Sequence, residues 1–174
     1  DVDRAVAAAR AAFPSRSLST PAERMAVLER LRTAYEARRE EFAVAMRREM
    51  GTPMGFSRAQ QAPTGSQHID ATLEAMAEFP FAAPSPRGGS QILAEPVGVA
   101  ALITPWNWPI NQISLKVPAA ALAGCSMVLK PSEESPLNAM LFAELIHEVG
   151  FPKGVFNLVN GDGRGVGTLS LIHI

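Results

Sequence analysis

EPVGVAALITPWNWP, residues 95–109, is the stretch of the chain that decides the fold. Its apolar run at 97–103 is continuous, which is typical of a strand buried on both faces of a parallel sheet. A helix-length segment follows at 111–123, and SMVLK at 126–130 then predicts a second strand. We therefore expect strands and helices to alternate in this part of the chain.

The alternation continues towards the carboxyl end of the chain. A further helix is expected to begin at Ser135-Pro136, which would cap it, and to end at Val149. VFNLV at 155–159 predicts a third strand. This βαβαβ order predicts an α/β fold with a doubly wound, Rossmann-like parallel sheet, incomplete at three strands.

The first half of the chain shows helical periodicity instead. Apolar residues predict a short amphipathic helix over 3–13, which Pro14 would end. TPAE at 20–23 has the pattern of a capping box and predicts the start of a long helix that Gly51 ends. Another helix is expected over 58–79. The fold should therefore have an amino-terminal helical region in front of its sheet.

A linker separates the two halves. Residues 80–89 hold three prolines and two glycines, which cannot continue a helix, and a short strand is expected near 91–94.

The composition is that of a globular protein, with 47% hydrophobic and 19% charged residues among 174. The formal net charge of −1 supplies no field for nucleic acid or an anionic membrane, and no apolar run is long enough to span a bilayer. The lone cysteine and the absence of a signal-peptide layout predict a soluble, cytoplasmic protein. A small molecule or another protein is therefore the expected partner.

In open parallel sheets, ligands bind outside the carboxyl ends of the strands. Each of the three predicted strand ends carries unusual residues: TPWNWP at 104–109, KPSE at 130–133 and a glycine-rich turn at 161–167. The three ends together predict a ligand site at one edge of the sheet.

An acid at the end of the second strand can accept hydrogen bonds from the hydroxyls of an adenosine ribose. Glu133 or its neighbour Glu134 could do this, with Lys130 donating to a ribose oxygen. The alternative is a solvated loop that leads into the next helix. The glycine-rich turn is a weaker signal, because Val166 stands where a dinucleotide fingerprint has its third glycine.

Asn107 carries a neutral N–H donor suited to an oxyanion that develops on a carbonyl, and its tryptophan and proline neighbours predict a rigid, water-poor loop. The alternative for this loop is a turn packed against the sheet. Cys125 has no acid or histidine beside it in the sequence and is interpreted as a packing residue. His68, His147 and His173 show no metal-ligand spacing, so no metal site is expected.

Taken together, these segments resemble the aldehyde dehydrogenase superfamily over about residues 2–170. The resemblance rests on their order and spacing as well as their residues. The matching segments are VDRAV at 2–6, EMGTP at 49–53, EPVGV at 95–99, ITPWNWP at 103–109, LKPSE at 129–133, SPL at 135–137 and GVFNLVNG at 154–161.

The resemblance implies a role for each matching position. Asn107 would be the catalytic oxyanion donor that stabilises the thiohemiacetal and thioester intermediates, and Glu133 would favour NAD although NADP remains possible. Glycines of the last turn would let backbone and helix approach the adenine and pyrophosphate. The implied cofactor-binding set is Ile103, Thr104, Pro105, Trp106, Asn107, Lys130, Ser132, Glu133, Gly163 and Gly167.

The resemblance also implies three parts. Residues 1–82 would be helices that pack on the cofactor domain, residues 83–95 a linker and a strand of an oligomerisation region, and residues 96–174 the first part of an NAD(P)-binding domain. The full-length enzyme would oxidise an aldehyde to a carboxylic acid through a thioester, as a homodimer or homotetramer.

The family's nucleophilic cysteine and its glutamate partner belong beyond residue 174, so the chain itself is expected to be inactive. The missing initiator methionine and the departing tail, Leu171–Ile174, predict a piece of a longer reading frame. Two alternatives stay open. One is a non-catalytic nucleotide-binding or interaction fragment with an unpaired linker strand, and the other is a semialdehyde dehydrogenase that acylates coenzyme A.

Overall fold

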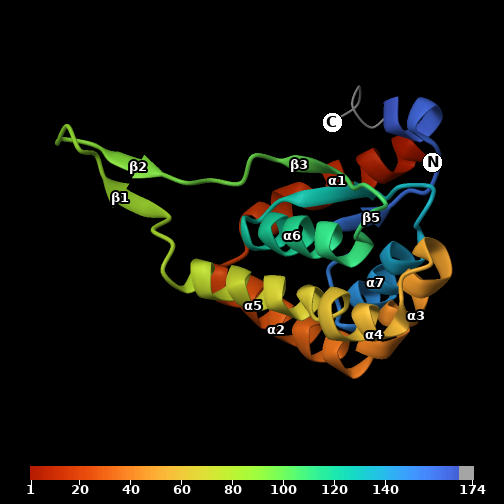
Figure 1. Ribbon diagram of the computed structural model, residues 1–174. Helices are drawn as coiled ribbons and strands as arrows, with labels where there is room; N and C mark the ends of the chain where they lie inside the picture. The colour runs from red at the N-terminus through yellow and green to blue at the C-terminus, as the bar shows by residue number, and fades with distance from the viewer. Residues whose placement is uncertain (169–174) are drawn as a thin grey trace.

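The computed structural model describes residues 1–168. Figure 1 shows a parallel sheet between helical layers, with a long hairpin that stands away from the body. The strands are β1 (Ala82–Pro84), β2 (Gln91–Leu93), β3 (Val99–Ile103), β4 (Ser126–Lys130) and β5 (Phe156–Leu158). The helical segments are α1 (Val2–Ser17), α2 (Pro21–Ala37), α3 (Arg39–Met50), α4 (Met54–Phe56), η1 (Ser57–Gln61), α5 (Thr64–Ala77), α6 (Pro109–Leu122), α7 (Leu137–Glu148) and η2 (Gly163–Gly167).

The parallel sheet has the order β3-β4-β5 and confirms the predicted α/β fold. Ile103 pairs with Lys130, and Leu129 pairs with Leu158, so all three strands end at the same edge. β4 is buried throughout because it has a neighbour on each side and helices on both faces. β3 was expected to be buried on both faces, but it is only half-buried because it pairs with β4 alone, and Val97 before it is 89% exposed.

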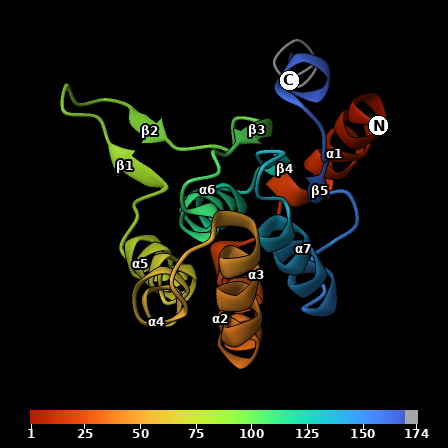
Figure 2. The ribbon, with the colours of Figure 1, turned by 45° about the vertical axis from the view of Figure 1, so that its right-hand side comes forward.

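The sheet separates two hydrophobic clusters. On one face, Val2, Val6 and Ala9 of α1 pack against Val128 and Val159. On the other face, the side chains of β4 that point away from α1 pack under α6 and α7, and these helices in turn contact α2, α3 and α5 (Figure 2). The amino-terminal helices therefore bury much of their apolar surface against the βαβαβ unit.

Two helix boundaries differ from the prediction because tertiary contacts override local signals. Pro14 does not end α1, which continues to Ser17. Arg16 in its last turn donates to the Ala121 carbonyl at 2.6 Å and holds this turn against α6. The long helix expected after residues 20–23 is divided at Arg38, whose backbone departs from helical geometry.

The divided helix keeps both of its predicted ends. The capping box is present, since the Glu23 amide donates to Thr20 Oγ1 at 3.2 Å and the Thr20 amide donates to Glu23 Oε2 at 2.7 Å. Gly51 ends α3 with a φ of 68°, in the left-handed region that glycine adopts without strain. The helix expected over 58–79 begins earlier, at Met54, and passes through the π-helical turn η1.

The linker contains a strand that the sequence did not reveal. β1 pairs antiparallel with β2, with Ala82 opposite Leu93. The strand near residues 91–94 was therefore predicted correctly, and the unpaired linker strand that belonged to the interaction-fragment alternative is not found. Ile92 and Leu93 are more than half exposed, at 55% and 61%, because the hairpin projects from the body.

The start of α7 is capped from outside its own segment. Ser135 was expected to cap this helix, but its buried hydroxyl has no hydrogen-bond partner among residues 1–168. The Leu137 amide instead donates to Glu49 Oε1 of α3 at 2.7 Å. An acceptor 88 positions earlier in the chain thus replaces the local cap.

Within residues 1–168, every helix is too short or too polar to cross a bilayer.

Candidate active site and cofactor edge

The carboxyl ends of the three parallel strands meet at one edge. The Thr104 amide donates to the Lys130 carbonyl at 3.1 Å, and the Val159 amide donates to the Leu129 carbonyl at 2.9 Å. These bonds continue the strand pairing up to the ends of the strands, so the three segments that follow the strands start side by side. The structure therefore gathers the predicted segments at one place.

The segment after β3 is fixed at its ends and open in its middle. Thr104 is buried, and the Trp108 indole donates to the Gln61 carbonyl at 3.4 Å. Between them, Pro105 and Asn107 are exposed, and Trp106 is 54% exposed. The water-poor loop expected around Asn107 is thus not present in this chain, because Trp106 lies against solvent.

Ile103, the last residue of β3, is 40% exposed and belongs to the same open surface. Together with residues 105–107 it forms an exposed surface that includes the Trp106 ring and the Asn107 side chain.

The segment after β4 holds an ion pair at the edge of the sheet. Lys130 Nζ lies 2.9 Å from Glu133 Oε2; the Lys130 side chain is 5% exposed and that of Glu133 is 46% exposed. The Glu133 backbone amide and Lys130 lower the pKa of the Glu133 carboxyl, so its anionic form is favoured. Of the two acids that the sequence offered, Glu133 is the one placed beside Lys130, whereas the Glu134 amide donates to Ser132 Oγ at 3.3 Å.

The segment after β5 approaches the same carboxylate. The Gly163 backbone amide also lowers the pKa of Glu133, which places the start of η2 near this acid. Gly163 is exposed, with no atom within 4 Å of the position where a Cβ would stand, and Gly167 is buried. The turn therefore places an exposed glycine next to an acid.

Within this turn, Gly161 and Gly165 have no room for a side chain. The sequence reasoning had assigned neither of them a role. Gly161 has a φ of 154°, and a Cβ there would lie 2.3 Å from Val166 Cγ2. A Cβ on Gly165 would lie 2.7 Å from Asp162 Oδ1, which accepts from the Gly165 amide. An Asp followed by small residues is the pattern of a helix N-cap, so Asp162 could have been identified from the sequence.

Cys125 lies at the opposite edge of the sheet from Asn107, directly before β4 begins. It is 3% exposed, and its amide donates to the Ala120 carbonyl at the end of α6. This burial agrees with the predicted packing role.

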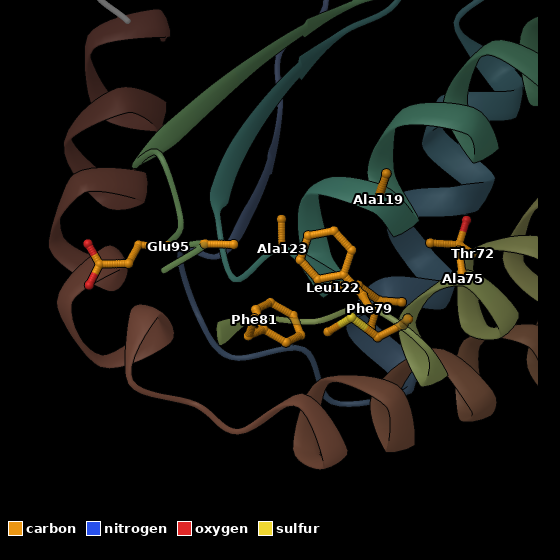
Figure 3. Close-up of a pocket in the computed structure, with 10 residues that line it drawn as sticks. Thr72, Ala75, Phe79, Phe81, Glu95, Ala119, Leu122 and Ala123 are labelled. Atoms are coloured by element: carbon orange, nitrogen blue, oxygen red, sulfur yellow. The ribbon is translucent and has the colours of Figure 1, made fainter. Parts of the chain in front are cut away.

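An apolar pocket of about 310 Å³ also lies away from the strand ends. Figure 3 shows Phe79, Phe81 and Leu122 around it, with the Glu95 carboxylate turned away from the rings. The Thr72 hydroxyl beside it already donates to a carbonyl one turn earlier in α5. The described residues that line this pocket offer no convergent polar groups to orient a reacting ligand, so we place the candidate site at the strand ends.

In the described part of the chain, His, Cys, Asp and Glu side chains form no group of three that could hold a metal ion. His173 and the tail Leu171–Ile174 lie outside the described residues.

The polar groups at the strand ends suit a dinucleotide. A carboxylate paired with a buried lysine matches the two hydroxyls of a ribose, and a glycine-rich helical start matches phosphate oxygens. The open space above Gly163 leaves room for such a group.

A parallel α/β sheet with helices on both faces and polar residues at its carboxyl edge is typical of the nucleotide-binding α/β class. The model of the "Aldehyde dehydrogenase family" matches residues 1–173. The chain belongs to this family.

Known relatives agree with this assignment. A 3-succinoylsemialdehyde-pyridine dehydrogenase of a Pseudomonas species is 46% identical over 173 residues, which are 99% of this chain and 36% of the relative. Among solved structures, an aldehyde dehydrogenase of Bartonella henselae has a TM-score of 0.93 at 46% identity, over 95% of this chain and 35% of that one.

A second solved structure is a variant of aldehyde dehydrogenase C from Pseudomonas syringae, in complex with NAD+ and octanal. It has a TM-score of 0.93 at 50% identity, over 97% of this chain and 34% of its own. The chain thus spans about a third of the length of the relatives that it matches.

Proposed function

We propose that the parent protein is an NAD(P)-dependent aldehyde dehydrogenase, which oxidises an aldehyde to a carboxylic acid, and that this chain supplies the adenosine side of its cofactor site. The observation that carries the proposal is the meeting of three strand ends, with the Lys130–Glu133 pair beside the turn at Gly163. The membership in the family and the NAD+ complex of one neighbour support it.

In this proposal each segment does one part of the binding. The Glu133 carboxylate accepts hydrogen bonds from the ribose hydroxyls, and Lys130 holds that carboxylate and donates to a ribose oxygen. Gly163 and Gly167 let phosphate groups approach backbone amides of η2. Ile103, Pro105 and Trp106 are exposed and would line the cleft together with the backbone of the buried Thr104, and Ser132 lies beside the acid. The bound dinucleotide would accept hydride from the substrate.

Asn107 is proposed to act on the aldehyde itself. Its exposed amide lies at the same edge and would donate a hydrogen bond to the carbonyl oxygen as negative charge develops there. An amide has no charge to titrate, so this donor would serve at any physiological pH. In the full-length parent, Asn107→Ala should lower kcat by roughly 10²–10³-fold and leave the KM for NAD+ nearly unchanged.

The preference between NAD+ and NADP+ would follow from Glu133. The anionic form of Glu133 is favoured, and a carboxylate that meets ribose hydroxyls repels the additional phosphate of NADP. We therefore propose NAD+ as the preferred cofactor.

The test compares two neighbouring acids by calorimetric titration of the chain with NAD+ and NADP+. Glu133→Gln should weaken NAD+ binding by roughly tenfold and reduce the discrimination against NADP+, since a charge-assisted hydrogen bond is lost. Glu134→Gln is the matched control, because Glu134 is exposed and adjacent but is not placed beside Lys130, and it should leave both affinities unchanged. Equal effects of the two substitutions would contradict the proposed role of Glu133.

The chain on its own is proposed to be catalytically inactive. Its lone thiol, Cys125, is buried at the opposite edge from Asn107 and is not available as a nucleophile there. Aldehyde-dependent formation of NADH by the purified chain, lost in Cys125→Ser, would disprove this.

The parent is further proposed to be a homodimer or homotetramer, in which the β1–β2 hairpin takes part in the contact. The exposed side chains of Ile92 and Leu93 support this, since apolar residues on a projecting hairpin are suited to burial by another chain. Ile92→Lys together with Leu93→Lys should lower the mass of the full-length parent in light scattering. A change at one exposed apolar residue outside the hairpin, Leu18→Lys, is the control.

A further inference from the structure

The loop between β4 and α7 carries the acid of the proposed ribose site, and it is held at both ends. At its start, Lys130 Nζ lies 2.9 Å from Glu133 Oε2. At its end, the Leu137 amide donates to Glu49 Oε1 at 2.7 Å. Between these two points the Ser135 amide donates to the Ser132 carbonyl at 3.2 Å and closes a turn. The loop is therefore short and fixed by one contact from its own strand and one from α3.

The loop has no means of capping α7 from within. Pro136 stands at the N-cap, where its side chain has no polar atom, and the buried Ser135 hydroxyl makes no hydrogen bond in the described part of the chain. An unpaired amide at the start of a buried helix costs stability, so an acceptor from elsewhere is required. Glu49, in the last turn of α3, supplies it.

Burial and the helix dipole act on the Glu49 carboxylate in opposite directions. A carboxylate at the first turn of a helix lies at the positive end of the helix dipole. The second oxygen, Glu49 Oε2, is buried and has no hydrogen-bond partner within the described residues. Burial of the group raises the pKa of Glu49, while the amides of Leu137 and Asn138 oppose that effect. The position of Glu49 is thus determined by α7 and not by solvent.

We propose that Glu49 is a positioning residue for nucleotide binding: by capping α7 it fixes the end of the loop and so sets where Ser132 and Glu133 stand. It acts through these residues and does not itself touch the nucleotide. The inference rests on the proposed function in so far as Glu133 is taken to bind the ribose.

The test uses two substitutions at Glu49 and a matched control in the same region. Glu49→Gln keeps an oxygen that can accept from the Leu137 amide, whereas Glu49→Ala removes the acceptor. The control is Ser57→Ala, because Ser57 is fully buried and donates to the Ala43 carbonyl of α3 at 3.0 Å, with no part in the loop. All three variants are made in the whole chain.

Two readouts separate positioning from general stability. Hydrogen exchange at the amides of residues 132–140 reports on the loop, and calorimetric titration with NAD+ reports on the site. Glu49→Ala should lose roughly fivefold in protection at Leu137 and a similar factor in NAD+ affinity, the size of one helix cap. Glu49→Gln should restore most of both, and Ser57→Ala should change neither, although it lowers the melting temperature.

A double substitution tests whether Glu49 acts through Glu133. If it does, Glu49→Ala should weaken NAD+ binding much less in the Glu133→Gln background than in the native chain, because the contact that it positions is already lost. Full additivity would overturn the positioning role, as would equal losses in Glu49→Ala and Ser57→Ala. Absence of NAD+ binding by the native chain would overturn the proposed function instead, and hydrogen exchange would still decide whether Glu49 fixes the loop.

Discussion

Substitutions of Arg24 and Gly124 should have strongly coupled effects on the free energy of unfolding. Arg24 is 5% exposed, and its guanidinium makes four hydrogen bonds: to Ser19 Oγ at 3.0 Å, to the Ser19 carbonyl at 2.6 Å, to the Ser17 carbonyl at 3.3 Å and to the Leu122 carbonyl at 3.0 Å. A Cβ on Gly124 would lie 2.6 Å from the centre of that guanidinium. Arg24 therefore holds the end of α6, and residue 124 must be a glycine to leave room for its guanidinium.

The magnitudes follow from these contacts. Arg24→Ala should cost about 3 kcal/mol, because charged hydrogen bonds are worth about 1.5–3 kcal/mol each but water can replace those to the half-buried Ser17 and Ser19 carbonyls. Gly124→Ala carries two costs in the native chain: about 1–2 kcal/mol for a φ of 85°, and a further ~2 kcal/mol for displacing the guanidinium. When Arg24 is absent only the backbone cost remains. The double substitution should thus be about 2 kcal/mol less destabilising than the sum of the single ones.

Urea unfolding followed by circular dichroism measures this cycle. Gly150→Ala is the control, because Gly150 ends α7 with a φ of 79° and has open space where its Cβ would stand. It should cost only the backbone amount, with or without Arg24. Equal costs of Gly124→Ala and Gly150→Ala in the native chain would refute the reasoning, as would additivity of Arg24→Ala and Gly124→Ala.

Four further outcomes are expected. Tyr35→Phe should cost about 1–2 kcal/mol in urea, because the buried Ala62 carbonyl loses a 2.6 Å hydrogen bond. Burial raises the pKa of Tyr35, so the native chain should also lose stability above pH ~10, a loss that Tyr35→Phe should abolish. Gly161→Ala should weaken NAD+ binding in calorimetry, because its Cβ would displace Val166 within the glycine-rich turn. The raised pKa of Glu49 means that protonation favours the folded chain, so its stability relative to Glu49→Gln should rise as pH falls, in urea titrations at several pH values.

The sheet and its edge could be predicted from the sequence because each depends on local pattern. SMVLK at 126–130 is an uninterrupted apolar strand closed by a lysine, and it is the fully buried centre of the sheet. The segments after the three strands were predicted to lie together for the same reason, since topology alone brings the ends of parallel strands together.

The remaining features depend on contacts between distant parts of the chain. No local signal shows that Arg16 would hold α1 together beyond Pro14, because its acceptor is 105 positions away. Arg38 divides the second helix where its guanidinium meets Glu41, Glu144 and Glu148, two of which belong to α7. The cap of α7 by Glu49 is equally remote, so the local Ser135 was predicted in its place.

The glycine-rich turn shows a second reason why some features could not be predicted from the sequence. Comparison with a dinucleotide fingerprint gave only a weak match in this turn, and the resemblance to the family drew attention to Gly163 and Gly167. Whether a side chain fits at a glycine depends on its three-dimensional neighbours, and those constrain Gly161 and Gly165 instead.

During synthesis, Arg24 leaves the ribosome long before the carbonyl that it binds at the end of α6. The Leu122 carbonyl that it binds is encoded 98 positions later, a delay of roughly 5–20 s at ordinary rates of translation. During that interval the apolar faces of α2, α3 and α5 have no sheet to cover them, since α6, β4 and α7 are not yet made. Synthesis of this protein therefore includes a period in which a nascent helical segment presents its future core to chaperones.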